Sequence, residues 1–158
     1  MNSVPITLHG SHLLKDELHR LKTKERPAVI NAISEARAQG DLSENAEYDA
    51  AKERQSFIEG RIAELEGKLS AAQIIDPTLL DAEGRVVFAS TVALEDLETG
   101  DKVTYQIVGV DEADLKENKV SITSPIARAL IGKYAGDTVE VLAPGGNHEY
   151  EILDVKYI

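Results

Sequence analysis

The stretch Gly40-Asp41-Leu42-Ser43-Glu44-Asn45-Ala46-Glu47-Tyr48-Asp49 decides the fold predicted for this chain of 158 residues. It lies between two long segments with helical periodicity, and it holds four acidic residues and no basic one. Gly40 suits the C-terminal end of a helix, where left-handed backbone is least costly for glycine. Asp41 suits the N-cap of a second helix, with Glu44 three residues later as its capping-box partner. The stretch is therefore predicted to be an acidic turn between two helices.

The segment before this turn is predicted to form one long helix over residues 8–37, with Thr7 as its N-cap. Pro27 interrupts the segment, and it should bend the helix because proline removes one backbone hydrogen bond. Apolar periodicity on both sides of Pro27 favours a bend over a loop. The apolar residues form a narrow stripe, which is typical of a seam between two helices. They are Leu14, Leu18, Leu21, Val29, Ile30, Ile33 and Ala36.

The segment after the turn is predicted to form a second helix from Glu44 to about Gln73. Because the connection is short, the two helices must run antiparallel. Each helix of about 30 residues is roughly 45 Å long. Residues 1–76 are therefore predicted to be a thin antiparallel two-helix coiled coil with an acidic tip at residues 41–47. The apolar residues of the second helix have heptad-like spacing and are Ala51, Ile58, Ile62, Leu65, Leu69 and Ala72.

The composition changes after Asp76-Pro77, which is expected to end the second helix. We interpret residues 77–84 as a linker and residues 85–158 as a C-terminal domain. One short helix is expected in that domain, with Ser124 as its N-cap and Gly132 as its stop. The fold class is therefore α+β, a coiled coil followed by a small antiparallel β-sheet domain with one short helix. The strand-like runs are residues 86–88, 91–94, 103–108, 120–122, 138–141 and 148–155.

The charge balance is acidic, with 28 acidic and 17 basic residues and a formal net charge of −11. Residues 1–76 contribute −3 and residues 77–158 contribute −8. Such a chain should repel free nucleic acid overall, because duplex binding relies on basic residues that neutralise phosphates. The absence of cysteine excludes disulfides, thiolate metal sites and cysteine nucleophiles.

The remaining composition favours a protein that works in the cytoplasm without a small-molecule substrate. Aromatic residues make up only 4% and there is no tryptophan, so an aromatic-lined ligand pocket is not expected. The sequence has no apolar run long enough for a membrane span. Its N-terminus lacks the basic-then-apolar layout of a signal peptide. We therefore expect a soluble, cytoplasmic protein with no membrane partner.

The acidic turn has two interpretations from its chemistry alone. In the first, Asp41 and Glu44 only cap the second helix, which is worth about 1 kcal/mol. In the second, the same two carboxylates assist a metal. Mg²⁺ takes only one or two protein carboxylates and keeps several waters. Two carboxylates at a protruding tip would then complete a site that another protein supplies.

Two segments resemble the signatures of a known family. The stretch Gly40 to Tyr48 is similar to the hallmark of the bacterial Gre transcript-cleavage factors, the GreA/GreB family. The stretch Ser124-Pro125-Ile126-Ala127-Arg128-Ala129-Leu130-Ile131-Gly132-Lys133 resembles the second signature of that family. The order and spacing of the two agree across essentially the whole chain. The modest number of basic residues near the tip favours the less basic of the two branches of the family.

This resemblance implies a transcription elongation factor that is not itself an enzyme. The C-terminal domain, FKBP-like in fold, would dock on the rim of the RNA polymerase secondary channel. The coiled coil would enter the channel and stimulate Mg²⁺-dependent cleavage of backtracked RNA by the polymerase active site, which rescues arrested complexes. By motif match, Asp41 and Glu44 would hold Mg²⁺ jointly with the polymerase.

The resemblance also implies contacts around the tip. Arg37 and Lys52 occupy the places where the family's basic patch would meet the 3′ end of the backtracked RNA. The other four candidates would orient the tip acids or contact the polymerase, and ordinary roles in a first helical turn are the alternative for them. They are Ser43, Asn45, Glu47 and Tyr48.

Three other functions are open. Relatives with the same architecture but altered tips inhibit the polymerase instead, although both acids and Asn45 are present here. A chaperone or scaffold coiled coil would need its apolar seam but not its tip charges. A prolyl isomerase is suggested only by an analogy of fold, which is weak evidence for function.

Overall fold

The computed structural model describes residues 3–40 and 45–158, and the chain divides into two compact units. The first, the hairpin unit, comprises residues 11–71. The second, the sheet unit, comprises residues 72–158 together with the N-terminal segment up to Gly10. Composition placed the boundary at residue 76. The N-terminal segment joins the sheet unit because strand β1 (Val4–Thr7) pairs in parallel with β2 (Ala72–Ile75), two strands that periodicity did not predict.

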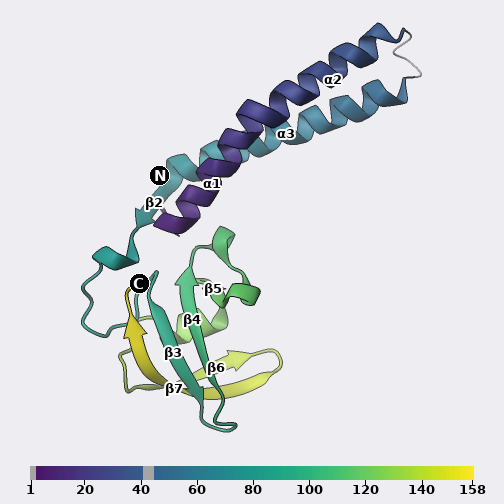
Figure 1. The fold of residues 1–158 in the computed structure, drawn as a ribbon. Coiled ribbons are helices and arrows are strands. Elements are labelled where there is room, and N and C mark those ends of the chain that lie inside the picture. The colour runs from purple at the N-terminus through teal and green to yellow at the C-terminus, as the bar shows by residue number, and fades with distance from the viewer. Residues whose placement is uncertain (1–2, 41–44) are drawn as a thin grey trace. The chain divides into compact units, whose positions relative to one another are not determined.

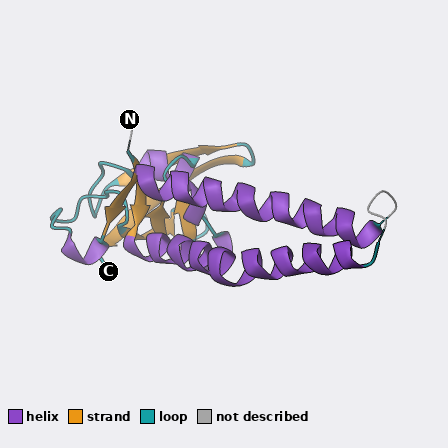
Figure 2. Ribbon diagram, turned by 90° about the horizontal axis from the view of Figure 1, so that it is seen from above, coloured by secondary structure: helices purple, strands orange, loops and turns teal. Residues whose placement is uncertain are grey.

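The hairpin unit is built from two helical runs, and Figures 1 and 2 show α2 and α3 side by side. The first run is continuous over residues 8–38, and the second returns antiparallel to it. The predicted long helix is thus confirmed. So is its N-cap, because the Thr7 hydroxyl accepts a hydrogen bond from the Gly10 N–H at 3.1 Å. The elements are α1 (Leu8–Arg20), the π-helical η1 (Leu21–Glu25), α2 (Arg26–Ala38) and α3 (Ala46–Ala71).

A π-helical turn, and not a loop, precedes Pro27. The Arg26 N–H donates to the Leu21 carbonyl, five residues back, where an α-helix would reach back four. Proline lacks an N–H, and its ring clashes with the carbonyl four residues earlier in a regular α-helix. The wider turn makes room for that ring, so the helix passes Pro27 without ending.

The two runs pack along an apolar seam. Its buried core is formed by Leu21, Val29, Ile58, Ile62 and Leu65, with Leu14 and Leu18 beside it. Most of the predicted stripe is therefore confirmed. Ile30 was wrongly assigned to it, because its neighbour Val29 occupies the seam and Ile30 is 51% exposed.

Bidentate ion pairs connect the two helical runs. Arg61 donates from Nε and Nη2 to the two carboxylate oxygens of Glu17, at 2.7 and 2.9 Å. Arg26 donates from the same two nitrogens to the carboxylate oxygens of Glu59, both at 2.8 Å. These hydrogen bonds hold the pKa of the Glu17 and Glu59 carboxyls below the usual range. Ion pairs that keep contact with solvent add little stability. Their consequence here is register, since each pair fixes which residues of the two runs face each other.

The sheet unit contains a five-stranded sheet with the order β5-β4-β3-β7-β6 (Figure 1). Its pairs are antiparallel except β4 and β5, which are parallel. The predicted α+β class is confirmed. The remaining elements are η3 (Pro77–Leu79), β3 (Thr91–Asp96), β4 (Lys102–Val108), η4 (Val110–Glu112), η5 (Leu115–Glu117), β5 (Lys119–Ser121), α4 (Pro125–Leu130), β6 (Thr138–Ala143) and β7 (Gly146–Lys156).

One predicted strand is wrong. Residues 86–88 form no strand, although Val86 is fully buried. Its N–H donates to the Lys133 carbonyl at 2.7 Å and its carbonyl accepts from the Gly132 N–H at 2.9 Å. The chain then turns at Ala89, which has a φ of +73°. The apolar run is therefore a core-filling loop, which periodicity cannot distinguish from a short strand.

The short helix α4 begins and ends as the sequence predicted. The Ser124 hydroxyl accepts from the Ala127 N–H at 3.2 Å, and Gly132 has a φ of +85° after the last turn. Ala127 and Leu130 are fully buried and pack into the core of the sheet unit. No helix in the described part of the chain is both long enough and apolar enough to cross a membrane.

Candidate functional site

The described part of the hairpin's end begins with the last turn of α2. The Gln39 N–H donates to the Ala36 carbonyl at 3.2 Å, and the Gly40 N–H donates to the Arg37 carbonyl at 3.3 Å. Gly40 has a φ of +112°, so the predicted glycine at the end of this helix is confirmed. The next four residues, 41–44, lie outside the described residues. The metal role predicted for Asp41 and Glu44, and the contact predicted for Ser43, fall on these residues and remain predictions.

Asn45 connects the two helices of the hairpin at the site. Its Oδ1 accepts a hydrogen bond from the Tyr48 N–H at 3.0 Å, which makes Asn45 the N-cap of α3. Its Nδ2 donates to the Ala36 carbonyl in the last turn of α2 at 2.8 Å. The helix accordingly begins at Ala46 and not at Glu44. Asparagine is among the best N-cap residues, so the sequence carried this signal and the capping-box pattern obscured it.

Substitutions of Asn45 should separate its two hydrogen bonds. Asn45→Ala removes both and should destabilise the hairpin unit by about 2 kcal/mol, about 1 for the cap and about 1 for the bond to Ala36. Asn45→Asp keeps an acceptor for the cap but has no donor, so it should cost about half as much. Urea unfolding followed by the helical circular dichroism signal measures both. Equal losses for the two variants would contradict the capping role.

The other two described candidates lie in the first turn of α3. Glu47 is exposed, and Tyr48 is half-buried and contributes its backbone N–H to the Asn45 cap. Glu47 and Asp49 place negative charge at this helix start, where it is favourable by about 0.3–1 kcal/mol each. The structure thus gives both a local role, and their predicted contacts with a partner remain predictions.

Arg37 and Lys52 meet at a groove next to this end of the hairpin. The groove has a volume of about 280 Å³. Lys52 Nζ donates to the side-chain oxygen Oε1 of Gln55 at 3.1 Å, which holds the ammonium group at the groove. The apolar part of the lining is Ile33 and the half-exposed Ile30. The full lining is Ile30, Ile33, Ser34, Arg37, Lys52 and Gln55.

The chemistry of this groove fits one segment of a nucleic acid. Arginine and lysine bind phosphate oxygens, and the two isoleucines give the same groove an apolar part. Fifteen positions separate Arg37 and Lys52 in the sequence, and the hairpin places both at one groove. The sequence named both residues separately but did not predict the groove.

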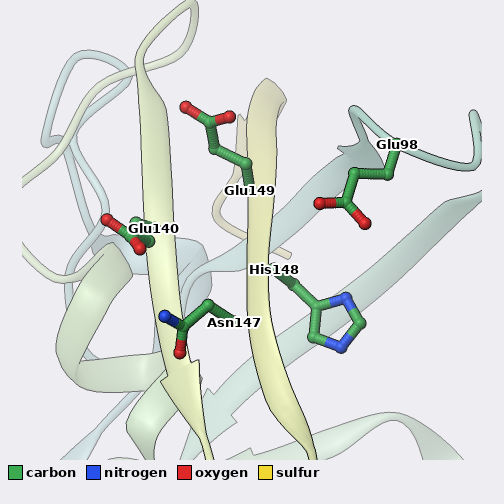
Figure 3. A pocket seen from close by; sticks show the side chains of 5 residues that line it. All are labelled: Glu98, Glu140, Asn147, His148 and Glu149. Carbon is green, nitrogen blue, oxygen red and sulfur yellow. The ribbon is translucent and has the colours of Figure 1, made fainter.

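A second hollow, in the sheet unit, has the opposite charge. Figure 3 shows its side chains, which come from β6, from β7 and from the turn between β3 and β4. Near it, His148 Nδ1 lies 3.4 Å from Asp96 Oδ2, and two backbone N–H groups and His148 hold the pKa of the Asp96 carboxyl below its usual range. Three carboxylates line this hollow, so it should repel phosphate. Its lining is Glu98, Glu140, Asn147, His148 and Glu149.

A third hollow, also in the sheet unit, is mainly apolar and lies beside α4. It has a volume of about 290 Å³, and Leu115 at its edge is 75% exposed. An exposed apolar side chain next to an apolar groove is typical of a surface that binds another protein. The lining is Ala113, Asp114, Leu115, Lys119, Val120, Ser121, Ser124 and Ile126.

Two family models match the chain, one for each half. The model described as "Transcription elongation factor, N-terminal" (GreA_GreB_N) matches residues 4–74, and the model described as "Transcription elongation factor, GreA/GreB, C-term" matches residues 81–157. A helical hairpin followed by a small sheet domain is thus the architecture of a class of transcription elongation factors. The chain belongs to the GreA/GreB family, and the resemblance found in the sequence is confirmed.

Individual relatives agree with this assignment. The chain is 70% identical to the transcription elongation factor GreA of Ralstonia nicotianae over 158 residues, which cover 100% of both chains. It is 65% identical to GreA of Neisseria meningitidis serogroup A, again over 100% of both. Both relatives are named GreA, and not GreB. Among solved structures, GreA factor homolog 1 (Gfh1) of Thermus thermophilus is 29% identical, with a TM-score of 0.44 over 98% of this chain and 99% of that one.

Proposed function

We propose that this protein inserts its hairpin into the secondary channel of RNA polymerase and stimulates cleavage of backtracked RNA by the polymerase active site. The observation that carries the proposal is the groove of Arg37 and Lys52, which lies next to the acidic stretch in a chain that is otherwise acidic. Membership of the GreA/GreB family supports it. The protein is then a cofactor of the polymerase and not an enzyme, and cleavage returns an arrested complex to elongation.

The residues of the acidic stretch fit a shared Mg²⁺ site. Asp41 and Glu44 supply two carboxylates three residues apart, and Mg²⁺ takes one or two protein carboxylates. Among residues 3–40 and 45–158, no group of three or more His, Asp or Glu side chains gathers as a metal site. Two carboxylates leave the other Mg²⁺ ligands to water and to a partner, so Asp41 and Glu44 would hold the ion jointly with the polymerase. When bound, Mg²⁺ acts as a Lewis acid that activates water for phosphodiester cleavage.

The described residues of the hairpin have separate tasks in this mechanism. Arg37 and Lys52 bind phosphates near the 3′ end of the backtracked RNA and hold that segment next to the tip. Asn45 connects α2 and α3 at the base of the acidic stretch through its two hydrogen bonds. The backbone on both sides of the acidic stretch is thereby fixed before RNA arrives, which lowers the entropy lost on binding.

The sheet unit would dock on the rim of the channel. Its apolar groove next to α4, with the exposed Leu115, offers the surface most suited to a protein partner. The acidic hollow at His148 is unsuited to RNA. The polymerase rim is then bound by the sheet unit, which has the apolar groove, and the RNA by the hairpin unit, which has the groove of Arg37 and Lys52.

A cleavage assay tests this function directly. A stalled, backtracked polymerase complex with 3′-labelled RNA is incubated with Mg²⁺, with and without the protein. Rapid release of a short 3′ fragment only in the presence of the protein is the expected result. Binding to the polymerase without any release would instead indicate a channel-binding inhibitor, and absence of binding would indicate a scaffold role.

Loss of the two groove cations should weaken the action on RNA. We expect the double substitution Arg37→Ala and Lys52→Ala to raise the protein concentration for half-maximal cleavage by roughly tenfold, about 1.4 kcal/mol. The dependence on salt should become shallower, because fewer phosphates are neutralised. The matched control is Lys24→Ala with Arg54→Ala, which removes the same two charges from exposed hairpin positions outside the groove. An equal effect of the control would show that only total charge matters.

A further inference from the structure

Glu112 binds the start of the hairpin's first helix through its carboxylate. Oε2 accepts hydrogen bonds from the Thr7 N–H at 3.0 Å and from the Gly109 N–H at 2.9 Å, and Oε1 accepts one from the Thr7 hydroxyl. The Thr7 oxygen in turn accepts from the Gly10 N–H at 3.1 Å. All these residues belong to the sheet unit, and α1 continues from Gly10 into the hairpin unit as one helix.

The arrangement is a capping box in which the acid comes from another part of the chain. In an ordinary box, a threonine at the N-cap is partnered by a glutamate three residues later in the same helix. That position in α1 is Gly10, which has no side chain. Glu112, which follows Thr7 by 105 residues, fills the role instead. The same carboxylate caps η4, because it also accepts from Gly109. One side chain thus completes two helix starts.

The backbone is shaped around this carboxylate. A Cβ at Gly10 would overlap the Glu112 side chain, and a Cβ at Gly109 would lie 2.8 Å from the Pro5 carbonyl oxygen and 2.9 Å from Glu112 Oε2. Thr7 is only 3% exposed. The two glycines are therefore required by the close approach of β1 and η4, and a larger residue at either position would displace Glu112.

We propose that Glu112 is a positioning residue for RNA cleavage. It fixes the first turn of α1 within the sheet unit, at the start of the helix that leads to the acidic stretch. This inference rests on the proposed function. Loss of Glu112 should leave docking on the polymerase intact and reduce the maximal rate of cleavage. The protein still binds, but its acidic stretch reaches the polymerase active site in a smaller fraction of the complexes.

A double variant separates positioning from simple helix capping. Glu112→Ala removes the attachment and the capping partner together. Adding Gly10→Glu to it creates a local capping box at Thr7. The new glutamate accepts from the Thr7 N–H, as Glu112 does, but makes no bond to η4. The milder Glu112→Gln keeps an acceptor and serves if Glu112→Ala fails to fold. The matched control is Glu117→Gln, since Glu117 is the last residue of η5 just as Glu112 is of η4.

The readouts are amide hydrogen exchange at Thr7 and Gly10, and cleavage as a function of protein concentration. For Glu112→Ala we expect exchange at Gly10 to quicken at least tenfold and the maximal cleavage rate to fall about tenfold. The concentration for half-maximal cleavage should change less than twofold. In the double variant, protection of the Thr7 amide should return and the cleavage rate should stay low.

Two outcomes would overturn the inference. One is a double variant that recovers the full rate, because Glu112 would then act only as a helix cap. The other is a normal rate in Glu112→Ala, or in Glu112→Gln, despite faster exchange. Failure of the proposed function itself is recognised separately, since the wild-type protein would then release no RNA fragment while hydrogen exchange would still report the attachment.

Discussion

Asp41→Asn should abolish the stimulated cleavage of backtracked RNA, with a fall in rate of roughly 100-fold, while the hairpin remains folded. The amide has nearly the same shape as the carboxylate but has no charge and is a poor ligand for Mg²⁺. Even the loss of an outer-sphere partner of a catalytic metal costs about 10–100-fold. We expect Glu44→Gln to have an effect of the same order, measured as the rate of 3′-fragment release at saturating protein.

The matched control for this substitution is Asp49→Asn. Asp49 lies in the first turn of α3 and is exposed. Its replacement by asparagine removes one negative charge, as Asp41→Asn does. Cleavage should continue at close to the wild-type rate in the control. Equal losses in both variants would show that the net charge near the tip matters and not a metal ligand. Unchanged cleavage in Asp41→Asn would rule out the proposed metal role of that carboxylate.

The largest effect on stability is expected for Leu65→Ala. Leu65 is fully buried in the seam of the hairpin, against a cluster that includes Leu21 and Ile62. Removing a buried leucine side chain costs about 2–5 kcal/mol, because the transfer energy is lost and a cavity remains. Urea unfolding followed by circular dichroism at a helical wavelength should show the transition of the hairpin at a much lower denaturant concentration.

Phe57→Ala provides the contrast on the same helix. Phe57 is 73% exposed, so the substitution removes a larger side chain but should change the stability by less than about 0.5 kcal/mol. If Phe57→Ala destabilised the hairpin as much as Leu65→Ala, the apolar seam would not be what holds the two helices together.

The parts of the fold that local chemistry determines were predictable from the sequence. Apolar spacing gave the two long helices, and Ser124 and Gly132 gave the limits of α4. The strand predicted at residues 86–88 was wrong because a buried apolar loop has the same composition as a short strand. The pairing of β1 with β2 joins residues about 68 positions apart, and no local pattern reports such a pairing.

The candidate site also has features that a local sequence signal reports and features that depend on distant packing. Arg37 and Lys52 were named from a motif, but their shared groove depends on the packing of α2 on α3. The cap at Asn45 had a local signal that the competing pattern of Asp41 and Glu44 obscured. The bonds between Glu112 and Thr7 had none, since Gly10 occupies the place where a capping glutamate belongs.

The π-helical turn at Leu21–Glu25 sets the rotation of the rest of the first helical run about its own axis. A seven-residue repeat that starts at Leu14, Leu18 and Leu21 would continue at residues 28, 32 and 35, but the buried residues are Val29, Ile33 and Ala36. The chain thus contains one residue more than the repeat requires, and the wide turn absorbs it. Regular α-helix there would rotate everything beyond it by about 100°. Glu35 would then face the seam, and Arg37 would leave its groove.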